Sequence, residues 1–487
     1  MDLEKEELAD KKTLLEEGLT YDNYVFRVTS DKMFVLLETP LVTRGDKRTF
    51  FKNYPKIKEF LISQGIQFVS EEPEELDGKF IVAKGHPPRE GHPERIEFLP
   101  KFERLIKKTE EDLIKEIPED EGKAEDLREK VQKILCVKEG EAIAKWHPLT
   151  PPTPGINVFG EEVQPPPLKE EKTFELSDNV YLDEKERLIK AKISGVVTFE
   201  KGKIDVLPDY VLKGNVDFSV GNIYFYGKKL TIQGDIKFGF KVIVEGDLEL
   251  RGCTENKVKI EVKGNFLADG VIRGEATTVE VWGEAKIGGA EFAKILVHGN
   301  LYVKDYLVFT YTLAEGELKA IEGKGWIYGG EVRAIGNVEV KMVGHTAQTL
   351  TIIGAGYRPN IVEDYLVTIE RIEILNEFLT KIDDGLKLAS KLKEEGRLTE
   401  EKLKYVEKLI NERKRITEEI AKLEPMLKDL STKLTEYRKK TIKIQQKIFP
   451  NVTLRIAEFT YINIEELNGP IVFYLDVTEI KYREGGK

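Results

Sequence analysis

Residues 229–250 read KLTIQGDIKFGFKVIVEGDLEL, and this stretch decides the fold. Two short runs rich in β-branched residues each end in a glycine followed by an aspartate, at Gly234-Asp235 and Gly246-Asp247. Alternating β-branched and polar residues are typical of half-buried strands. Glycine permits the positive φ of a tight corner, and the polar residue after it can bond the turn backbone. The pattern therefore predicts short strands separated by corners.

The same kind of dipeptide, glycine followed by Asn, Asp or Glu, recurs along the middle of the chain. It is found at Gly214-Asn215, Gly221-Asn222, Gly234-Asp235, Gly246-Asp247, Gly264-Asn265, Gly283-Glu284, Gly299-Asn300, Gly316-Glu317 and Gly330-Glu331. One such coil cannot bury its own inner face, so coils must stack to form a core. We therefore predict a right-handed β-helix (β-solenoid) over residues 169–360. A β-sandwich is the alternative, but it needs longer and more even strands.

Residues 361–449 change to a helical periodicity. One apolar series has the spacing of a single helix face, and a second alternates steps of four and three, as in a heptad repeat. The first series is Ile369, Ile372, Leu375, Leu379, Ile382, Leu386 and Ala389, and the second is Ile416, Ile420, Leu423, Leu427, Leu430, Leu434, Tyr437, Thr441, Ile444 and Ile448. A short connection with Thr399 as candidate N-cap predicts an inserted antiparallel coiled-coil hairpin. Pro425 should kink the second helix rather than split it, because the heptad phase continues through it.

The flanking segments complete the predicted organisation. Residues 1–20 form a short amphipathic helix at best, and residues 21–168 indicate an N-terminal α+β domain with strands near 24–28, 33–37 and 80–83. A proline-rich stretch, 148–167, suits an extended loop or stiff linker. Residues 450–487 are strand-like again, and we expect them to return and cap the open end of the β-helix, whose exposed edge would otherwise favour aggregation. The fold class is thus multidomain and mainly β.

Composition excludes several classes of protein. The 487 residues carry a net charge of −11, which argues against nucleic acid as the main partner. Two cysteines, Cys136 and Cys253, exclude a disulfide scaffold and fit a reducing compartment. The sequence shows no signal peptide and no apolar run long enough to span a bilayer, so we predict a cytoplasmic protein without a membrane partner. High Lys and Glu with few Met and Cys resembles a thermophile's composition.

Taken together, the motifs resemble the flagellar assembly protein A family of bacteria. The resemblance covers nearly the whole chain after about residue 20. It rests on Val82-Ala-Lys-Gly85 with Gly91, Val137-Lys-Glu-Gly-Glu-Ala-Ile-Ala144, Pro154-Gly-Ile-Asn-Val-Phe-Gly160, Phe218-Ser-Val-Gly-Asn-Ile223, the repeats at 230–236 and 242–248, and Val343-Gly-His-Thr-Ala-Gln-Thr-Leu-Thr-Ile-Ile-Gly354. The resemblance implies an N-terminal domain, a β-helix and a coiled-coil hairpin, with no enzymatic activity and, in some members, a link to flagellation. Where relatives tend to have Asp-Gly after Gly91, this chain has His92-Pro93.

The histidines are the first candidates for chemistry. His86, His92 and His147 lie in proline-rich loops and would supply three ligands of a metal site if they converged. Histidines flanked by proline in loops are usually surface residues, and this interpretation is favoured. His298 and His345 fall in the predicted solenoid, where some β-helical acyltransferases use a catalytic histidine. Those enzymes have a strict hexapeptide repeat, which this sequence lacks.

Three further patterns each have a structural interpretation that we favour. Gly323–Gly330 and Gly354–Gly356 hint at a phosphate loop but lack the Lys-Ser/Thr and helix order of a nucleotide site, so solenoid corners explain them better. Asp235, Asp247 and Glu284 would form an acidic ladder able to hold a cation if coils stack in register, or would simply cap turn amides. The basic run 437–447 indicates a solvated helix face, with contact to an acidic partner or to the acidic solenoid as the alternative.

We predict a non-enzymatic scaffold that acts by protein–protein recognition. Protein partners would bind through the hairpin, chiefly its tip at Leu388–Leu403, or through the solenoid face, and a homo-oligomer is left open. No catalytic, cofactor-binding or metal-binding residue is predicted, and no cofactor. The alternatives are carbohydrate binding or processing on the β-helix face, and a polymer-forming scaffold resembling bactofilins.

Overall fold

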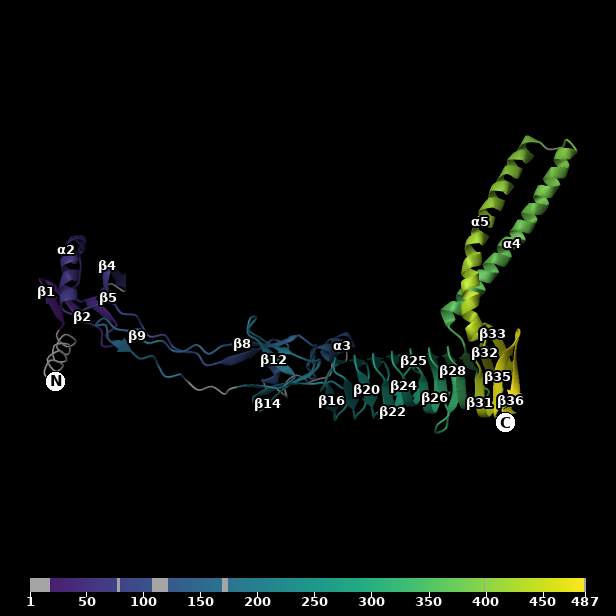
Figure 1. Cartoon of the computed structure of the whole chain (residues 1–487), viewed down its shortest axis with the longest axis horizontal. Coiled ribbons are helices and arrows are strands. Elements are labelled where there is room, and N and C mark those ends of the chain that lie inside the picture. Colours follow the sequence, from purple (N-terminus) through teal and green to yellow (C-terminus); the bar gives the residue numbers. More distant parts are fainter. Residues whose placement is uncertain (1–17, 77–78, 107–120, 169–173, 398, 486–487) are drawn as a thin grey trace.

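A computed structural model describes residues 18–76, 79–106, 121–168, 174–397 and 399–485 of the chain. The molecule is long, with a small N-terminal unit at one end, a β-solenoid toward the other, and a pair of helices that projects from the solenoid (Figure 1). The predicted N-terminal helix at residues 1–20 falls almost entirely outside the described residues. Its last part differs from the prediction, because Leu19 lies in a strand and is buried.

The N-terminal unit is a five-stranded sheet covered on one face by a helix. The sheet order is β1 (Leu19–Tyr21), β2 (Tyr24–Val28), β3 (Phe34–Leu37), β5 (Lys79–Lys84) and β4 (Val69–Leu76). Helix α2 (Arg44–Ser63) begins at a capping box formed by Thr43 and Asp46. Its apolar face buries Phe50, Tyr54, Ile57 and Leu61 against the sheet.

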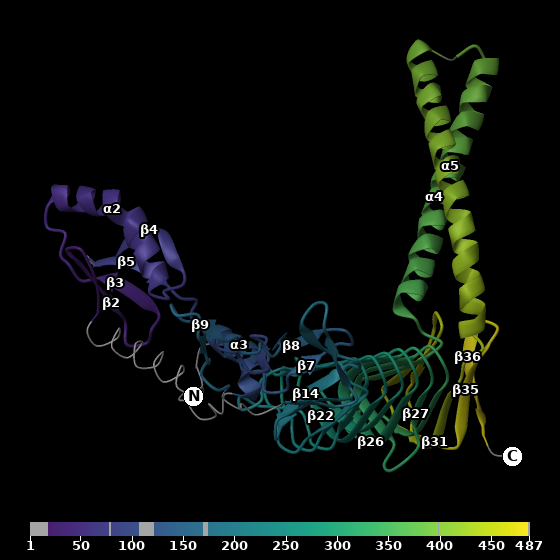
Figure 2. The same ribbon diagram turned by 60° about the vertical axis from the view of Figure 1, so that its left-hand side comes forward.

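Two chain segments run side by side from this unit to the next (Figures 1 and 2). Their backbones pair at His86 with Ile156, Arg89 with Thr153 and His92 with Thr150, one pair every three residues. Each pair exchanges two backbone hydrogen bonds of 2.8–3.1 Å. Short strands β9 (Gly155–Ile156) and β10 (Glu162–Val163) lie where these two segments meet the N-terminal unit. The proline-rich stretch is thus one side of a two-stranded connector.

A middle unit follows, built on two four-stranded sheets around one core. One sheet is β11 (Glu175–Leu176), β15 (Lys203–Leu207), β14 (Gly195–Glu200) and β7 (Cys136–Val137), and the other is β12 (Val180–Asp183), β13 (Leu188–Ala191), β8 (Ala142–His147) and β6 (Arg95–Phe98); η1 (Glu103–Leu105) and α3 (Glu121–Lys130) complete the unit. The β-helix therefore does not begin at residue 169. Residues 175–207 turn back as two antiparallel hairpins that pair with β8 and β7 and enter the core of the middle unit, so the parallel stacking of coils begins only after them.

The solenoid sheet starts at Asp209 and stacks its strands in three parallel columns, which we call face 1, face 2 and face 3 in chain order. Face 1 holds β16 (Asp209–Leu212), β18 (Lys229–Ile232), β20 (Asp247–Leu250), the starts of β22 (Phe266–Arg273), β24 (Ala285–Glu291) and β26 (Leu301–Ala314), then β27 (Leu318–Ala320), β29 (Val338–Val343) and β31 (Ile442–Ile448). Face 3 holds β17 (Ile223–Phe225), β19 (Lys241–Val244), β21 (Lys259–Val262), β23 (Thr278–Val281), β25 (Lys294–Val297), the end of β26, β28 (Trp326–Ala334), β30 (Thr351–Ala355) and β32 (Val452–Ile456). Face 2 consists of isolated bridges at Val216, Ile236 and Thr254 in the first coils and of segments of the longer strands in the later coils. The predicted β-solenoid is confirmed.

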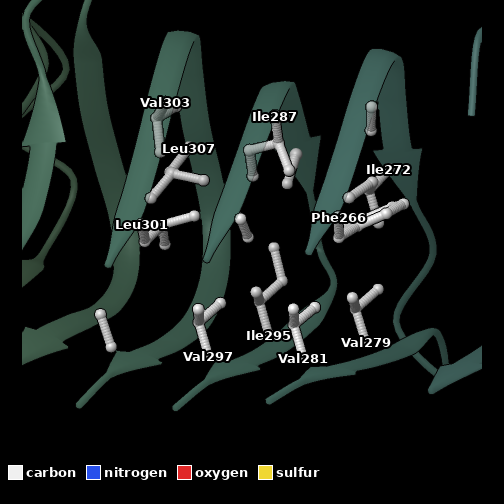
Figure 3. Close-up of a cluster of buried hydrophobic side chains, with 14 of the residues drawn as sticks. Phe266, Ile272, Val279, Val281, Ile287, Ile295, Val297, Leu301, Val303 and Leu307 are labelled. Carbon is white, nitrogen blue, oxygen red and sulfur yellow. The ribbon is translucent and has the colours of Figure 1, made fainter. Parts of the chain in front are cut away.

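Alternate residues of each strand point into the solenoid and form its core. In Figure 3, Phe266, Ile287 and Leu301 of face 1 lie opposite Val279 and Ile295 of face 3. At about 25 cal/mol per Å² of apolar surface removed from water, such a continuous core supplies the main driving force for stacking. No coil buries its inner face alone, so the stack is the stable unit.

Both ends of the parallel stack are covered. At the first coil, Ile134, Cys136 and Val196 of the middle unit join the solenoid core. At the last coil, antiparallel strands pair with the free edges: β33 (Phe459–Asn463) with β32, and β34 (Leu467–Asn468) and β35 (Ile471–Asp476) with β31, while β36 (Glu479–Glu484) pairs with β35. Burial raises the pKa of the Cys136 thiol to about 12, so it serves as a small apolar core residue. An end-to-end polymer would have to displace these covers.

Two kinds of corner close each coil. Between face 2 and face 3, each coil places one or two residues in the left-handed region, namely Gly221, Gly239, Lys257, Gly274, Phe292, Phe309, Gly329 with Gly330, Gly344 with Gln348, and Asn451. At the other two corners Gly323, Gly325 and Gly356 also have positive φ, whereas the stacked glycines such as Gly234 and Gly264 do not. The expected reason for those glycines is therefore wrong. They are required by space, since a Cβ on Gly234 would lie 2.6 Å from the carbonyl oxygen of Gly214 in the coil before it.

Candidate functional site

The main projection from the solenoid is a pair of helices, α4 (Pro359–Glu394) and α5 (Glu400–Tyr437), which we call the arm (Figures 1 and 2). It is inserted between face 3 and face 1 of one coil. Leu318 of β27 pairs with Val338, 20 residues later, whereas Val338 pairs with Ile442, 104 residues later. The arm therefore interrupts a single coil, and the solenoid resumes directly after it.

The chain leaves and re-enters at the corner where earlier coils have glycine followed by a polar residue. In those coils the side chain of one corner accepts a hydrogen bond from the backbone of the next: Asn265 Oδ1 from Glu284 N at 3.0 Å, and Asn300 Oδ1 from Glu317 N at 2.8 Å. Asn337 Oδ1 accepts in the same way from Thr441 N at 3.0 Å. The ladder of corner side chains thus holds the returning strand in register across the insertion.

The base of the arm is fixed to the solenoid by buried contacts. Val362 and Leu434 pack with Tyr357 and Ala457 in a small separate core. Arg438, at the end of α5, donates from Nε to Glu458 Oε1 at 2.9 Å, and the Glu458 side chain is only 7% exposed. This bond raises the pKa of the Arg438 guanidinium further above its ordinary value. Nε and Nη2 of Arg438 both donate to this one oxygen, and an ion pair with a carboxylate so buried fixes geometry more than it adds stability.

Tyr357 forms a second anchor beside this core. Its ring lies 4.1 Å from the Arg333 guanidinium and 5.5 Å from that of Arg455, and both arginines pair with Glu331. On the other side of the entry point, Arg358 donates to Glu315 at 3.0 Å. Apart from Glu331 and Arg333, which are close in the sequence, the contacting residues lie more than 20 positions apart, so no local pattern could have revealed them. Together they set the direction in which the arm leaves the solenoid.

Along the arm the two helices run antiparallel and share an apolar seam. Leu375 and Ile382 of α4 pack against Ile416 and Ile420 of α5. Flanking ion pairs fix the register: Arg371 Nε donates to Glu419 at 2.9 Å, and Arg413 Nε donates to Asp383 at 2.7 Å. The residue numbers of the two partners sum to 790 in the first pair and 796 in the second, and a nearly constant sum is expected where two helices run antiparallel. Helix α5 continues through Pro425, so that proline does not split it.

The predicted end of the second helix is wrong. The helix ends at Tyr437, and Thr441, Ile444 and Ile448, which continue the heptad pattern, do not belong to it. Ile442 to Ile448 form β31, whose isoleucines 442, 444 and 448 are all fully buried. Their β-branched side chains fit the period-2 burial of a strand, and the solenoid core needs this strand. Tertiary packing decides between two periodicities that the sequence leaves open.

The tip of the arm exposes four large apolar side chains, and other apolar side chains are exposed along the arm, among them Val367 at 65% and Phe378 at 51%. Leu388 and Tyr405 are 60% and 63% exposed, and Leu403 and Ile410 are also exposed. The seam residues themselves are covered: Leu375 and Ile416 are buried, and Leu386 and Leu409, nearer the tip, are partly buried. Four large apolar residues gathered at one remote end are more than the scattered apolar residues normal on a protein surface.

A hollow of about 400 Å³ lies beside the start of the arm. It runs over face 3 from Lys259 and Thr278 through Tyr311 and Leu313 to Pro359, the first residue of α4. Sequence analysis missed this site because its residues come from successive coils about 16 to 20 positions apart. The alternation of strand residues is the signal from which the outward column on face 3 could have been found.

The three loop histidines are not brought together. His86 and His92 lie at different positions along the connector, His86 against Phe68 with ring centres 4.9 Å apart, and His147 Nε2 lies 3.1 Å from Glu97 in the middle unit. Within the parts of the chain that the structure describes, no three His, Cys, Asp or Glu side chains cluster as a metal site would require. The connector is extended, and this keeps the loop histidines apart.

The two solenoid histidines occupy separate settings. His298 stacks on Trp282 at 5.3 Å, and its ring nitrogens lie 3.2 Å from Glu315 and 3.3 Å from Glu280. His345 stacks on Trp326 at 5.4 Å. Both histidines are therefore held by aromatic and polar neighbours of adjacent coils.

The acidic corner residues act as caps. Asp235 Oδ1 accepts a hydrogen bond from Cys253 N at 2.9 Å, and Asp247 Oδ1 accepts one from Asn265 N at 2.7 Å. Glu284 Oε1 accepts one from the side-chain Nδ2 of Asn300 at 2.8 Å. The hydrogen bond from the Cys253 amide lowers the pKa of Asp235 below its ordinary value. Asp247 and Glu284 lie in one ladder at the corner between face 3 and face 1, whereas Asp235 lies at the corner between face 1 and face 2, so the three do not form the single ladder predicted. Each carboxylate accepts a hydrogen bond from the next coil.

A second hollow, of about 560 Å³, bears on the carbohydrate alternative. It is lined by Asp235, Glu255, Glu291 and the exposed ring of Phe292. Three of its four carboxylates are engaged with cations, Glu275 being the fourth: Glu291 pairs with Arg273 at 3.1 Å, and both Asp235 and Glu255 pair with Lys237 at 3.1 Å. Carboxylates held in ion pairs are poor acid–base groups for hydrolysis, and these pairs also account for their position.

The remaining candidate residues from the sequence have structural roles in the fold. Gly329 and Gly330 form a left-handed corner, and a Cβ on Gly356 would overlap the carbonyl of Tyr437 at the base of the arm. The basic run divides between two elements, and four of its five cations pair within the chain: Arg438 with Glu458, Lys439 with Glu436, Lys443 with Glu339 and Lys447 with Glu466. The corner interpretation of the glycines is confirmed at these positions.

Comparison with known families gives two matches that together span nearly all of the chain. Residues 27–202 match the model of the Flagellar Assembly Protein A N-terminal region, and residues 208–480 match that of the Flagellar Assembly Protein A beta solenoid domain. The border between the two models coincides with the start of the solenoid sheet at Asp209. Searches of curated proteins and of solved structures found no match. Of the helices described, none is both long enough and apolar enough to cross a membrane.

Proposed function

Because the chain belongs to the flagellar assembly protein A family, we propose that it is a flagellar-assembly-related scaffold that recognises other proteins through its arm. One observation carries the proposal: the arm is rooted in a buried core at its base and exposes apolar residues at its tip. Exposed apolar surface of this kind marks interaction sites, so we infer that the tip contacts a partner.

In this proposal the solenoid serves as a rigid holder. Its continuous core and the anchors at Tyr357 and Arg438 keep the arm at a fixed direction, so that a bound partner is held at a set place. Rigid presentation lowers the entropy lost on binding. The two helices act as an antiparallel coiled-coil pair that covers its own seam, and a partner would contact the apolar side chains exposed outside the seam at the tip. Residence in the cytoplasm and the absence of enzymatic activity are parts of the same proposal.

A shortened arm tests the proposal. Deleting residues 384–411 and joining the ends with a short Gly-Ser turn keeps Asp383 beside Arg413 and leaves the seam at Leu375 and Ile416 intact. We expect this variant to lose partners that the full-length protein captures from a lysate of its source organism. A matched control, Lys422→Glu with Lys428→Glu, changes exposed positions near the base and should keep them. Capture of every partner by the shortened variant would show that the arm is not the recognition element.

A further inference from the structure

The N-terminal unit carries an unusual cationic surface on α2, at the end of the molecule remote from the arm (Figures 1 and 2). The helix has six Lys and Arg residues against two acidic ones, within a chain whose net charge is −11. Four of these cations, Arg44, Arg48, Lys52 and Lys56, follow one another at intervals of four residues and are exposed. Residues four apart on a helix are neighbours, so the four form a ridge, which we call the α2 ridge.

The ridge is not explained by stability. The neighbouring lysines of the same helix are paired, Lys47 with Glu75 at 2.8 Å and Lys58 with Glu71 at 2.6 Å. Among the residues that the structure describes, none of the four ridge cations has an ion-pair or hydrogen-bond partner for its side chain. Like charges four residues apart repel and destabilise a helix. A row of such repulsions with no compensating contact in the fold points to a charge outside it.

Apolar residues accompany the ridge on the outer side of the helix. Phe51 is 45% exposed and Ile62 is 54% exposed, whereas the inner face buries Phe50, Tyr54, Ile57 and Leu61. Residue 51 lies one turn from residues 48 and 55, so its ring is beside the cations rather than opposite them. Phe51 also packs edge-on against Phe80, which fixes the ring at the surface. The surface therefore offers both charge and a rigid apolar contact.

We propose that the α2 ridge, with Phe51 and Ile62, is a docking surface for an acidic, amphipathic segment of a partner protein. Charge complementarity selects an acidic partner, and the two apolar side chains select one that brings apolar residues with its acids. A long polyanion such as nucleic acid fits less well, because Glu59 lies within this face and strand β4 beside it adds exposed Glu71, Glu72 and Glu74. A flat anionic membrane would meet the same carboxylates.

This inference deepens the proposed function, on which it rests for the view of the chain as a scaffold. The arm and the α2 ridge lie at opposite regions of a long molecule (Figure 1). Two different partners bound there would be held apart by the solenoid and the connector. The chemistry of the two surfaces differs, since the tip of the arm is chiefly apolar and the ridge is basic.

The test uses the full-length protein and a labelled peptide of four Leu-Glu-Glu-Leu repeats, followed by fluorescence anisotropy at about 50 mM salt. We expect binding that Arg48→Glu with Lys52→Glu weakens about tenfold, and that salt near 0.5 M also weakens. Phe51→Ser should weaken binding several-fold at unchanged charge. The control Lys422→Glu with Lys428→Glu makes the same change in net charge on the arm and should leave binding unchanged. Circular dichroism melting confirms that each variant is folded.

Several outcomes would overturn the inference. These are equal peptide binding by the ridge variant and the wild type, tighter ridge-dependent binding of a 16-nucleotide single strand or of phosphatidylserine vesicles than of the peptide, and equal binding of a peptide with Lys in place of Glu. Sedimentation showing that the ridge is covered by a second copy would overturn it as well. The variant lacking residues 384–411 should bind the peptide normally, so failure of the arm proposal and failure of this inference give different results.

Discussion

The two kinds of solenoid corner use glycine for different reasons. At the corner between face 1 and face 2, glycines repeat because successive corners stack with no room for a side chain: a Cβ on Gly234 would meet the Gly214 carbonyl. At the corner between face 2 and face 3, backbone conformation is the constraint, and this corner tolerates Lys257, Phe292, Phe309, Gln348 and Asn451 at positive φ. At the first corner the lack of space excludes every side chain, whereas at the second the positive φ only raises the energy of residues that carry one.

The difference also shows in what each corner carries. The stacked corners hold ladders of polar side chains, such as Asn265 and Asn300, that bond the next coil. The left-handed corner projects its side chains outward, and Phe292 and Phe309 stack on each other with ring centres 5.4 Å apart. The first kind therefore fixes coil spacing, and the second is free to vary at the surface.

The sharpest test of this comparison is the same substitution in two consecutive coils. Gly234→Ala should destabilise the solenoid by about 3 kcal/mol, because its Cβ would lie 2.6 Å from a backbone oxygen that cannot move without shifting a coil. Gly214→Ala, in the first coil of the same corner, should have little effect, since no atom lies within 4 Å of its Cβ. Urea denaturation followed by the fluorescence of Trp282 and Trp326, both in the solenoid, measures the free energy of unfolding. Equal losses for the two variants would contradict the role of space.

The polar ladder predicts a smaller loss. Asn300→Ala removes the acceptor of Glu317 N and leaves that amide without its partner, at a cost of about 2 kcal/mol. Asn300→Ala and Asn300→Asp are both made in a Glu284→Gln background, which removes the carboxylate that Asn300 Nδ2 contacts at 2.8 Å. There Asn300→Asp keeps an acceptor oxygen without a repelling charge and should lose less. The same denaturation experiment applies, and the order Ala below Asp below the Glu284→Gln parent is the expected result. A loss for the Asp variant as large as that for Ala would show that packing, rather than the hydrogen bond, fixes the corner.

The corners also show how far the sequence predicts this fold. The recurrence of glycine with a polar residue located the solenoid because every coil must turn in the same way. It did not show why each glycine is needed, since contact between coils depends on residues 16 to 20 positions apart. The helical periodicity located the arm but ran on through Ile444 and Ile448, because apolar residues at those spacings also fit a strand.

The candidate site was predictable only in its outline. The tip at Leu388–Leu403 follows from the position of the turn between two helices. The anchors at the base join Tyr357 to Arg333 and Arg455, and Arg438 to Glu458, across segments that meet only in the folded chain. No spacing rule connects such residues. The α2 ridge was not predicted, because the sequence analysis singled out only the basic run 437–447, and only the ion pairs of the fold show which cations of α2 are left without a partner.

The left-handed corner predicts a gain where the stacked corners predict losses. Gln348 has φ 53° with an exposed side chain, so Gln348→Gly should relieve a strained conformation and stabilise the solenoid by about 0.5 kcal/mol. Gln348→Val should destabilise it by about 1 kcal/mol or more, because a β-branched residue fits this region poorly. Thermal unfolding of the two variants against wild type gives the comparison. A loss on substitution by glycine would mean that the side chain of Gln348 matters more than its backbone.

The smallest expected effect is a pH dependence at the stacked corner. Asp235 accepts a hydrogen bond from the Cys253 amide and lies 3.1 Å from Lys237 Nζ, and both contacts lower the pKa of its carboxyl group. Because the pKa is lower in the folded protein than in the unfolded chain, the carboxylate contributes stability above the unfolded value of about 3.9, and this is lost as pH falls through the folded value. The Asp235→Asn variant keeps an acceptor for Cys253 but has no charge to titrate. Its melting temperature should lie below that of the wild type at pH 6, and the two should converge as pH is lowered toward 3. The difference is small because the side chain is 42% exposed and solvent screens its charge. A constant gap between wild type and variant from pH 6 to pH 3 would show that the charge of Asp235 does not stabilise the corner, and that its hydrogen bond to the next coil is the whole of its contribution.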